Sequence, residues 1–164
     1  MAILKKVEIH WLVADPKRGK KFQGKDSNPE KWSVQFRVFD KAERDRLAKE
    51  FGFNFKTEEK EDGSGVYYKT TLSAFTRDTE GNLNRPITVI LGNGEPVDPN
   101  TVGNGSIANI SFIVKGKGDD ATRRLVGVQL LKHIVRKNDS EFELTEDFEV
   151  VAPADDGLDD EIVY

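Results

Sequence analysis

A basic loop near the N-terminus carries side chains suited to binding a charged polymer. The segment KRGKKFQGK places five cations, Lys17, Arg18, Lys20, Lys21 and Lys25, around Phe22. Lysine and arginine pair with phosphate oxygens, and an aromatic ring offers a face on which a base can stack. The loop therefore indicates nucleic-acid binding. A solvated loop with Phe22 packed onto the core is the alternative.

A second set of aromatic and basic residues alternates along two expected strands, residues 31–39 (KWSVQFRVF) and 66–77 (VYYKTTLSAFTR). Side chains of a strand point alternately to opposite faces. If Val34, Phe36 and Tyr68 face the core, the open face carries Arg37, Phe39, Tyr67, Lys69, Phe75 and Arg77. Cations that follow a backbone and rings that stack on bases are what a single nucleic-acid strand requires. Ordinary strand residues, partly covered by a helix or by the chain end, are the alternative.

The two tryptophans are assigned different roles. Trp32 begins its strand beside the basic loop, so we expect it to stack on a base. Trp11 falls on the apolar side of the strand expected over residues 3–13, so we expect it in the core.

Charge is divided unevenly along the chain. Up to Asn138 there are 25 basic and 18 acidic residues, a net charge of +7, and from Asp139 onward 11 acidic residues and no basic one give −11. An acidic end is either a solvating segment or a ligand for the basic surface of the body. We expect a body over residues 1–151 and an acidic tail over residues 152–164.

Catalytic and metal-binding chemistry find little support in the sequence. There is no cysteine, and the two histidines, His10 and His133, lie far apart. No nucleophile, zinc or phosphate-loop motif is present, and DDGLDD lacks the ligand spacing of a calcium loop. We therefore expect no enzyme, no metal and no cofactor.

The elements that must position these residues are mostly strands. Besides the two above, strand patterns cover residues 3–13, 87–92, 106–116 and 122–137, and one helix is expected after Asp40 as N-cap and before Gly52 as stop signal. The pattern predicts a mainly β fold, a small antiparallel barrel, with a β-sandwich as competitor. No apolar run approaches the length of a signal peptide or membrane span, so we expect a soluble cytoplasmic protein.

Taken together, these pieces resemble the OB-fold single-stranded DNA-binding proteins of tailed bacteriophages. The resemblance lies in KWSVQF, GSIANISFIVKGKG, RLVGVQLLKHI and above all the acidic end DDGLDDEIVY. It implies an OB-fold-like five-stranded antiparallel barrel with one short helix and long basic loops, acting in the host cytoplasm. It also implies non-sequence-specific binding that protects single-stranded DNA during replication and recombination.

The same resemblance implies a regulatory tail that competes with DNA and recruits replication or recombination proteins. Its candidate residues are Asp155, Asp156, Asp159, Asp160, Glu161 and Tyr164. Self-association through the tail is a further interaction that it would permit. Three other functions remain open: an RNA-binding or RNA-chaperone barrel, a protein-interaction adaptor, and a hydrolase with unrecognised carboxylates.

Overall fold

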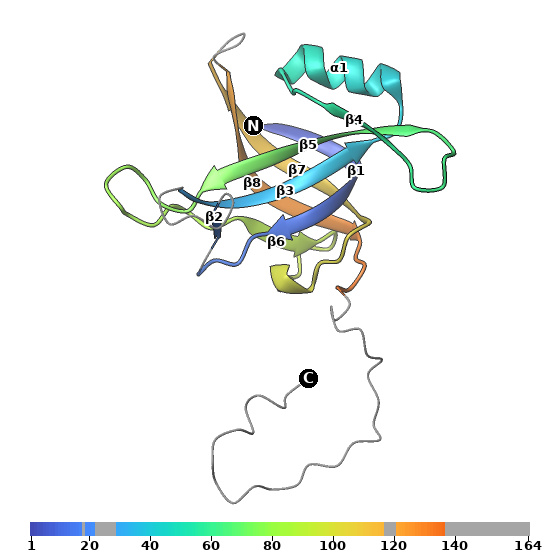
Figure 1. Ribbon diagram of the computed structural model, residues 1–164. Coiled ribbons are helices and arrows are strands. Elements are labelled where there is room, and N and C mark those ends of the chain that lie inside the picture. Colours follow the sequence, from blue (N-terminus) through green and yellow to red (C-terminus); the bar gives the residue numbers. More distant parts are fainter. Residues whose placement is uncertain (18, 22–28, 117–120, 137–164) are drawn as a thin grey trace, which may run out of the picture.

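Eight strands and one α-helix form the part of the chain that the computed structural model describes, residues 1–17, 19–21, 29–116 and 121–136 (Figure 1). The strands are β1 (Ala2–Val13), β2 (Lys20–Lys21), β3 (Glu30–Val38), β4 (Lys56–Glu59), β5 (Val66–Phe75), β6 (Thr88–Leu91), β7 (Ser106–Lys115) and β8 (Thr122–Lys132). The helix α1 spans Lys41–Phe51, and a short 3₁₀ turn, η2, spans Pro99–Thr101. Residues 137–164, which include the whole expected tail and its boundary at 151/152, lie outside the described residues.

Five strands close into a ring in the order β1, β3, β5, β8, β7 and back to β1. All pairings within it are antiparallel except that of β5 with β8, which is parallel. The expectation of a mainly β, OB-fold-like chain with a single described helix is confirmed, with one parallel pair where a wholly antiparallel ring was expected. Figure 1 shows β5, β3 and β1 side by side across the front, with β7 and β8 behind them.

The interior of the ring is filled by alternate side chains of these strands. On β3 Val34 and Phe36 are buried, as the period-two pattern predicted, and so are Trp32 and Val38. Facing residues on the other strands complete the core, among them Ile9, Leu72, Ile110, Phe112 and Leu125.

Helix α1 covers one end of the ring. Asp40 is its N-cap, with the side chain accepting from the Ala42 N–H at 3.2 Å, and Gly52 ends it in the left-handed conformation at φ 76°. Leu47 is the helix's buried residue. The chain then packs Phe53 edge-on against Phe36, with ring centroids 5.2 Å apart, so an aromatic cluster seals this end.

Strand β1 departs from simple alternation at two points. The pairing register shifts between Leu4 and Val7 and again between His10 and Val13, and both Lys6 and Trp11 adopt positive φ, 54° and 55°. Each irregularity is a β-bulge, which inserts one residue and changes which face the following side chains occupy. Trp11 is consequently 64% exposed, so the expectation that it lies in the core is wrong.

Candidate nucleic-acid interface

The outward face of β1, β3 and β5 forms one continuous polar and aromatic surface, here called the open face. Strand register places its residues in rows: Arg37 lies opposite Lys69, Gln35 opposite Thr71, and Lys31 opposite Phe75. On the other side of β3, His10 of β1 lies opposite Gln35. The alternation that buries one set of side chains therefore gathers the other set here.

One end of the open face carries a stack of rings and cations. Phe39 is 47% exposed, and its ring centroid lies 6.2 Å from that of Tyr67. The Arg37 guanidinium lies 4.5 Å from the centroid of the Tyr67 ring, and Lys60 Nζ lies 5.2 Å from that of Phe39. These cation–π contacts hold positive charge against both rings. A base that stacks here would displace or extend an existing stack.

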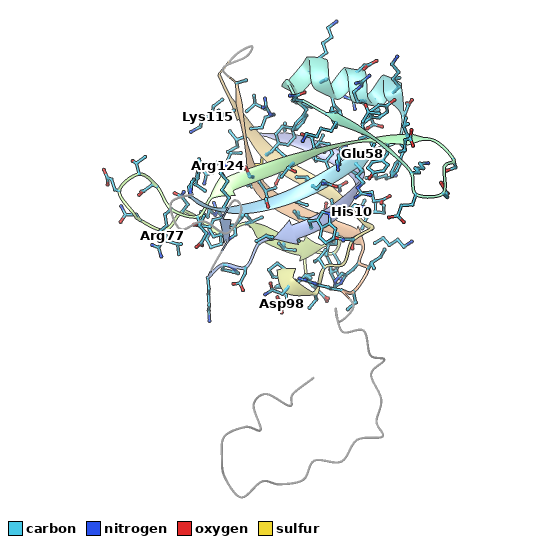
Figure 2. The ribbon with its side chains drawn as sticks, viewed as in Figure 1. His10, Glu58, Arg77, Asp98, Lys115 and Arg124 are labelled. Atoms are coloured by element: carbon cyan, nitrogen blue, oxygen red, sulfur yellow. The ribbon has the colours of Figure 1, made fainter. Side chains whose placement is uncertain are left out.

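The opposite end carries Phe75, which is 50% exposed. Lys31 Nζ lies 4.9 Å from the centre of its ring. Arg77 follows, and its Nη1 donates to the Gly81 carbonyl at 3.0 Å, so the guanidinium is held near the turn after β5. Figure 2 shows Arg77 and Glu58 towards opposite ends of the molecule.

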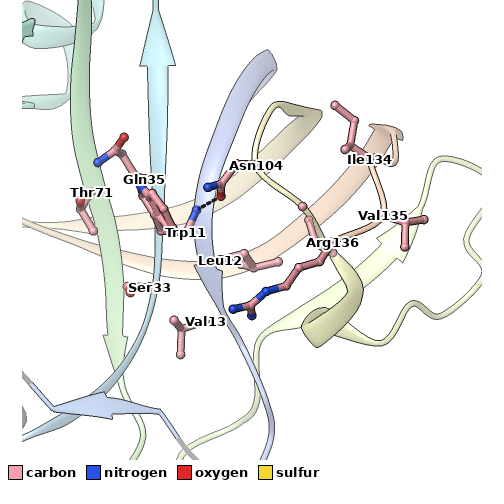
Figure 3. A pocket seen from close by; sticks show the side chains of 12 residues that line it. Trp11, Leu12, Val13, Ser33, Gln35, Thr71, Asn104, Ile134, Val135 and Arg136 are labelled. Atoms are coloured by element: carbon pink, nitrogen blue, oxygen red, sulfur yellow. Dashed lines mark hydrogen bonds between the residues drawn. The ribbon is translucent and has the colours of Figure 1, made fainter. Parts of the chain in front are cut away.

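Trp11 occupies the middle of the open face and lines a groove of about 790 Å³ (Figure 3). Its backbone N–H donates to Asn104 Oδ1 at 2.7 Å, so this donor at the bulge has a hydrogen-bond partner. The groove floor comes from Ser33, Gln35 and Thr71 of the open face. A large ring exposed above a groove is the surface that a flat, aromatic ligand would use.

The far wall of the groove is built from two distant segments, residues 102–104 and 134–136. The Gly103 N–H donates to the Ile134 carbonyl at 2.6 Å, and the Arg136 N–H donates to the Thr101 carbonyl at 2.7 Å. An added Cβ at Gly103 would stand 2.9 Å from the Ile134 oxygen, so the close approach requires glycine. The described chain ends at this wall, since Arg136 is its last residue.

Carboxylates partly neutralise the positive charge of the open face. Lys69 Nζ pairs with Glu58 at 3.1 Å, and His10 Nε2 lies 2.7 Å from Glu8 Oε1. Burial lowers the pKa of His10, the hydrogen bond with Glu8 raises it in part, and the nearby Arg37 charge lowers it further. The face is thus mixed in charge: Arg37 and Lys60 lie near the carboxylates of Glu61 and Asp62, and Lys31 lies over the ring of Phe75.

The candidates from the sequence are distributed as follows. Arg37, Phe39, Tyr67 and Lys69 lie at one end of the open face, Phe75 lies at the other, and Arg77 follows the end of β5. Lys17 is exposed in the turn after β1, and Lys20 and Lys21 form β2, which extends the sheet beside β3. Arg18, Phe22 and Lys25 lie outside the described residues.

Trp32 is a correction. It is fully buried, and its Nε1–H donates to the Asp15 carbonyl at 2.7 Å, so no face of its ring is open to a base. The alternation of β3 already placed Trp32 on the apolar side, and that signal outweighs its position at the strand entrance. Sequence reasoning also missed Trp11, Lys31 and Lys60 as members of the open face.

The described part of the chain contains no group of three or more histidine, aspartate or glutamate side chains placed to hold a metal ion. None of its helices is long and apolar enough to span a membrane.

Comparisons with known proteins concern the fold. No protein-family model matches the chain, and no curated protein sequence matches it. Among solved structures, it is similar to gp2.5, a single-stranded DNA-binding protein of bacteriophage T7, at 13% identity over 88% of this chain and 96% of that one, with a TM-score of 0.47. It is also similar to the single-stranded DNA-binding protein of bacteriophage Enc34, at 10% identity over 86% of both chains, with a TM-score of 0.49.

A third structure is the Enc34 protein in complex with single-stranded DNA, at 12% identity over 80% of this chain and 86% of that one, with a TM-score of 0.47. These solved structures are phage single-stranded DNA-binding proteins. At such low identity, and with TM-scores below 0.5, the likeness carries no argument about what this chain does. What this chain binds must be inferred from its own residues.

Proposed function

We propose that the protein binds single-stranded DNA without sequence specificity along the open face, and that it acts by binding alone. The observation that carries the proposal is the series of rings on one sheet face: exposed Phe39 and half-buried Tyr67 at one end, exposed Trp11 in the middle and exposed Phe75 at the other. Each ring can stack on a base, and stacking tolerates every base because every base has a π-face.

The spacing of the rings fits a strand of several nucleotides. Tyr67 and Phe75 are eight residues apart on β5, which corresponds to about 26 Å at a rise of about 3.3 Å per residue. Lys31, Arg37 and Lys60 lie beside these rings and supply charge for the phosphates. A duplex keeps its bases stacked on one another, so their faces are not available to the rings.

A titration tests this proposal. Poly(dT), poly(U) and duplex DNA of equal length are added to the full chain at two salt concentrations, and binding is followed by anisotropy of a labelled oligonucleotide. We expect poly(dT) to bind more tightly than duplex, with log K falling against log salt by about 0.7 per phosphate neutralised. Preference for duplex, or a slope near zero, contradicts the proposal. Poly(U) binding much tighter than poly(dT) would favour the RNA-binding alternative.

We extend the proposal to the acidic end. Asp155 to Tyr164 contains five carboxylates and no basic residue, and the chain leaves the described region at Arg136, beside the Trp11 groove. A tethered anionic segment competes with DNA at an effective concentration that reaches about millimolar for short linkers. When DNA displaces it, the segment becomes available to replication or recombination proteins in the cytoplasm of the host.

Deletion of residues 155–164 tests this second part. We expect the truncated chain to bind poly(dT) more tightly than the full chain, with the larger gain at low salt, where charges are least screened. Equal affinities at low salt would show that the tail does not compete for the open face. Loss of a partner's binding on truncation would support recruitment separately.

A further inference from the structure

The Trp11 groove contains two side-chain amides whose orientation is fixed by what they contact. Asn104 Oδ1 accepts from the backbone N–H of Trp11 at 2.7 Å, and Gln35 Oε1 accepts from Arg37 Nε at 3.0 Å. Both partners can only donate, so the oxygen of each amide must face its partner. Each amide is left with its NH₂ group as the end available to a ligand.

Apart from the guanidinium of Arg136, the side chains of the rest of the lining are apolar or hydroxylic. Five aliphatic side chains form the walls: Leu12, Val13, Val102, Ile134 and Val135. Val135 is 62% exposed, and the indole of Trp11 lies alongside. Ser33 and Thr71 add hydroxyls that can donate or accept. Figure 3 shows the polar side chains of Gln35, Asn104 and Arg136 around Trp11.

This donor set discriminates between bases that otherwise stack alike. Thymine and cytosine are both pyrimidines, but thymine presents a carbonyl acceptor at position 4 and a methyl group, where cytosine presents an amino donor. The amide NH₂ groups can donate to the carbonyl of thymine. They cannot form a hydrogen bond with the amino group of cytosine, because both groups are donors. The aliphatic walls provide an apolar environment for the methyl group.

We infer that the groove is a subsite for one base of the bound strand and that it prefers a keto pyrimidine, thymine, over cytosine, with Gln35 as the residue that sets this preference. The inference rests on the proposed function, because it concerns one position along a strand bound to the open face. It makes the binding mildly biased by base composition, while stacking at Phe39, Tyr67 and Phe75 remains indifferent to sequence.

The test compares oligo(dT) and oligo(dC) of about 12 nucleotides, a length within the site sizes of OB folds. Affinities are measured at neutral pH by anisotropy, for the full chain and for two variants. We expect the wild-type chain to bind oligo(dT) about 3- to 10-fold more tightly, the range for one or two neutral hydrogen bonds.

Gln35→Glu keeps an oxygen for Arg37 and replaces the NH₂ donor with an acceptor. Because a carboxylate accepts from the cytosine amino group, this variant should lose the preference for oligo(dT) or reverse it. Ser73→Glu is the matched control, since it adds the same charge on the same face but outside the groove lining. It should weaken both oligonucleotides equally and keep the wild-type ratio.

The outcomes separate the two proposals. If neither oligonucleotide binds, the proposed function fails and this inference fails with it. If both bind the wild-type chain equally, or if Gln35→Glu keeps the wild-type ratio, the open face binds single strands but the groove does not read position 4 of the base. A ratio that changes equally in Ser73→Glu would also overturn the inference.

Discussion

Replacement of Trp11 separates binding from stability, because this residue is both exposed and conformationally strained. At 64% exposure it buries only about a third of its surface, so truncation to alanine costs about 0.5–1 kcal/mol of stability. Loss of one base stack should weaken single-stranded DNA binding by about 1–3 kcal/mol, a factor of about 5 to 150 in Kd.

The positive φ of Trp11 predicts a second effect, on the stability of variants at this position. Left-handed backbone costs a residue with a Cβ about 1–2 kcal/mol, and glycine avoids this cost. Trp11→Gly should therefore be more stable than Trp11→Ala by about 0.5–1 kcal/mol, after glycine's greater entropy in the unfolded chain is subtracted. This order reverses the usual one for a strand. Both variants should lose the same DNA affinity.

Denaturant unfolding and anisotropy with a labelled oligo(dT) measure the two effects. Trp32→Phe is the control: it removes a fully buried indole and the donor to the Asp15 carbonyl, so it should cost about 2–4 kcal/mol of stability and leave the affinity of the folded protein unchanged. The reasoning is refuted if Trp11→Ala loses several kcal/mol of stability while retaining full affinity, or if Trp11→Gly is the less stable variant.

Three further predictions follow from individual side chains. Phe75→Ala should weaken oligo(dT) binding by about 1–3 kcal/mol without changing the salt slope, and a lower melting temperature at full affinity would contradict this. Gly103→Ala should lower stability by about 1–3 kcal/mol, because the new Cβ would stand 2.9 Å from the Ile134 oxygen; an unchanged melting temperature would count against the groove wall. Burial lowers the pKa of His10 below its usual value of 6.5. At a pH just below 6.5 this histidine is therefore protonated more fully in the unfolded chain than in the folded one. The free energy of unfolding consequently falls as the pH falls through this window. His10→Gln should therefore lose less stability than the wild-type chain on acidification through this window, as measured by thermal unfolding, and an equal loss would contradict the assignment.

Sequence patterns predicted the parts of the fold in which local rules and tertiary packing agree. Strand β3 alternates strictly, so Val34 and Phe36 were assigned to the core and Arg37 to the surface, as observed. Helix α1 spans Lys41–Phe51 and is capped by Asp40 and Gly52, as the sequence predicted. These features depend on residues close together in the sequence, so the hydrophobic periodicity predicts them directly.

The parts that were missed depend on contacts between distant segments. The second bulge of β1 changes the face that its side chains occupy after His10. The local sequence pattern does not indicate the bulges, because their backbone N–H groups donate to the side chains of Asn104 and Asn109, about a hundred residues away in the sequence. Strand β4 is a charged segment, KTEE, that is a strand because it pairs with β5. The groove combines β1 with residues 102–104 and 134–136, so only the folded chain reveals it.

The intrinsic fluorescence of the protein tests most directly whether single-stranded DNA lies on the open face over Trp11. The chain has two tryptophans, of which Trp32 is fully buried and Trp11 exposed, so a base stacked on Trp11 affects one emitter and not the other. We predict that poly(dT) quenches part of the emission with the same midpoint as binding measured by anisotropy. Trp11→Phe should still bind, more weakly, and show no quenching. Binding that leaves the wild-type emission unchanged, or quenching that persists in Trp11→Phe, would contradict this account.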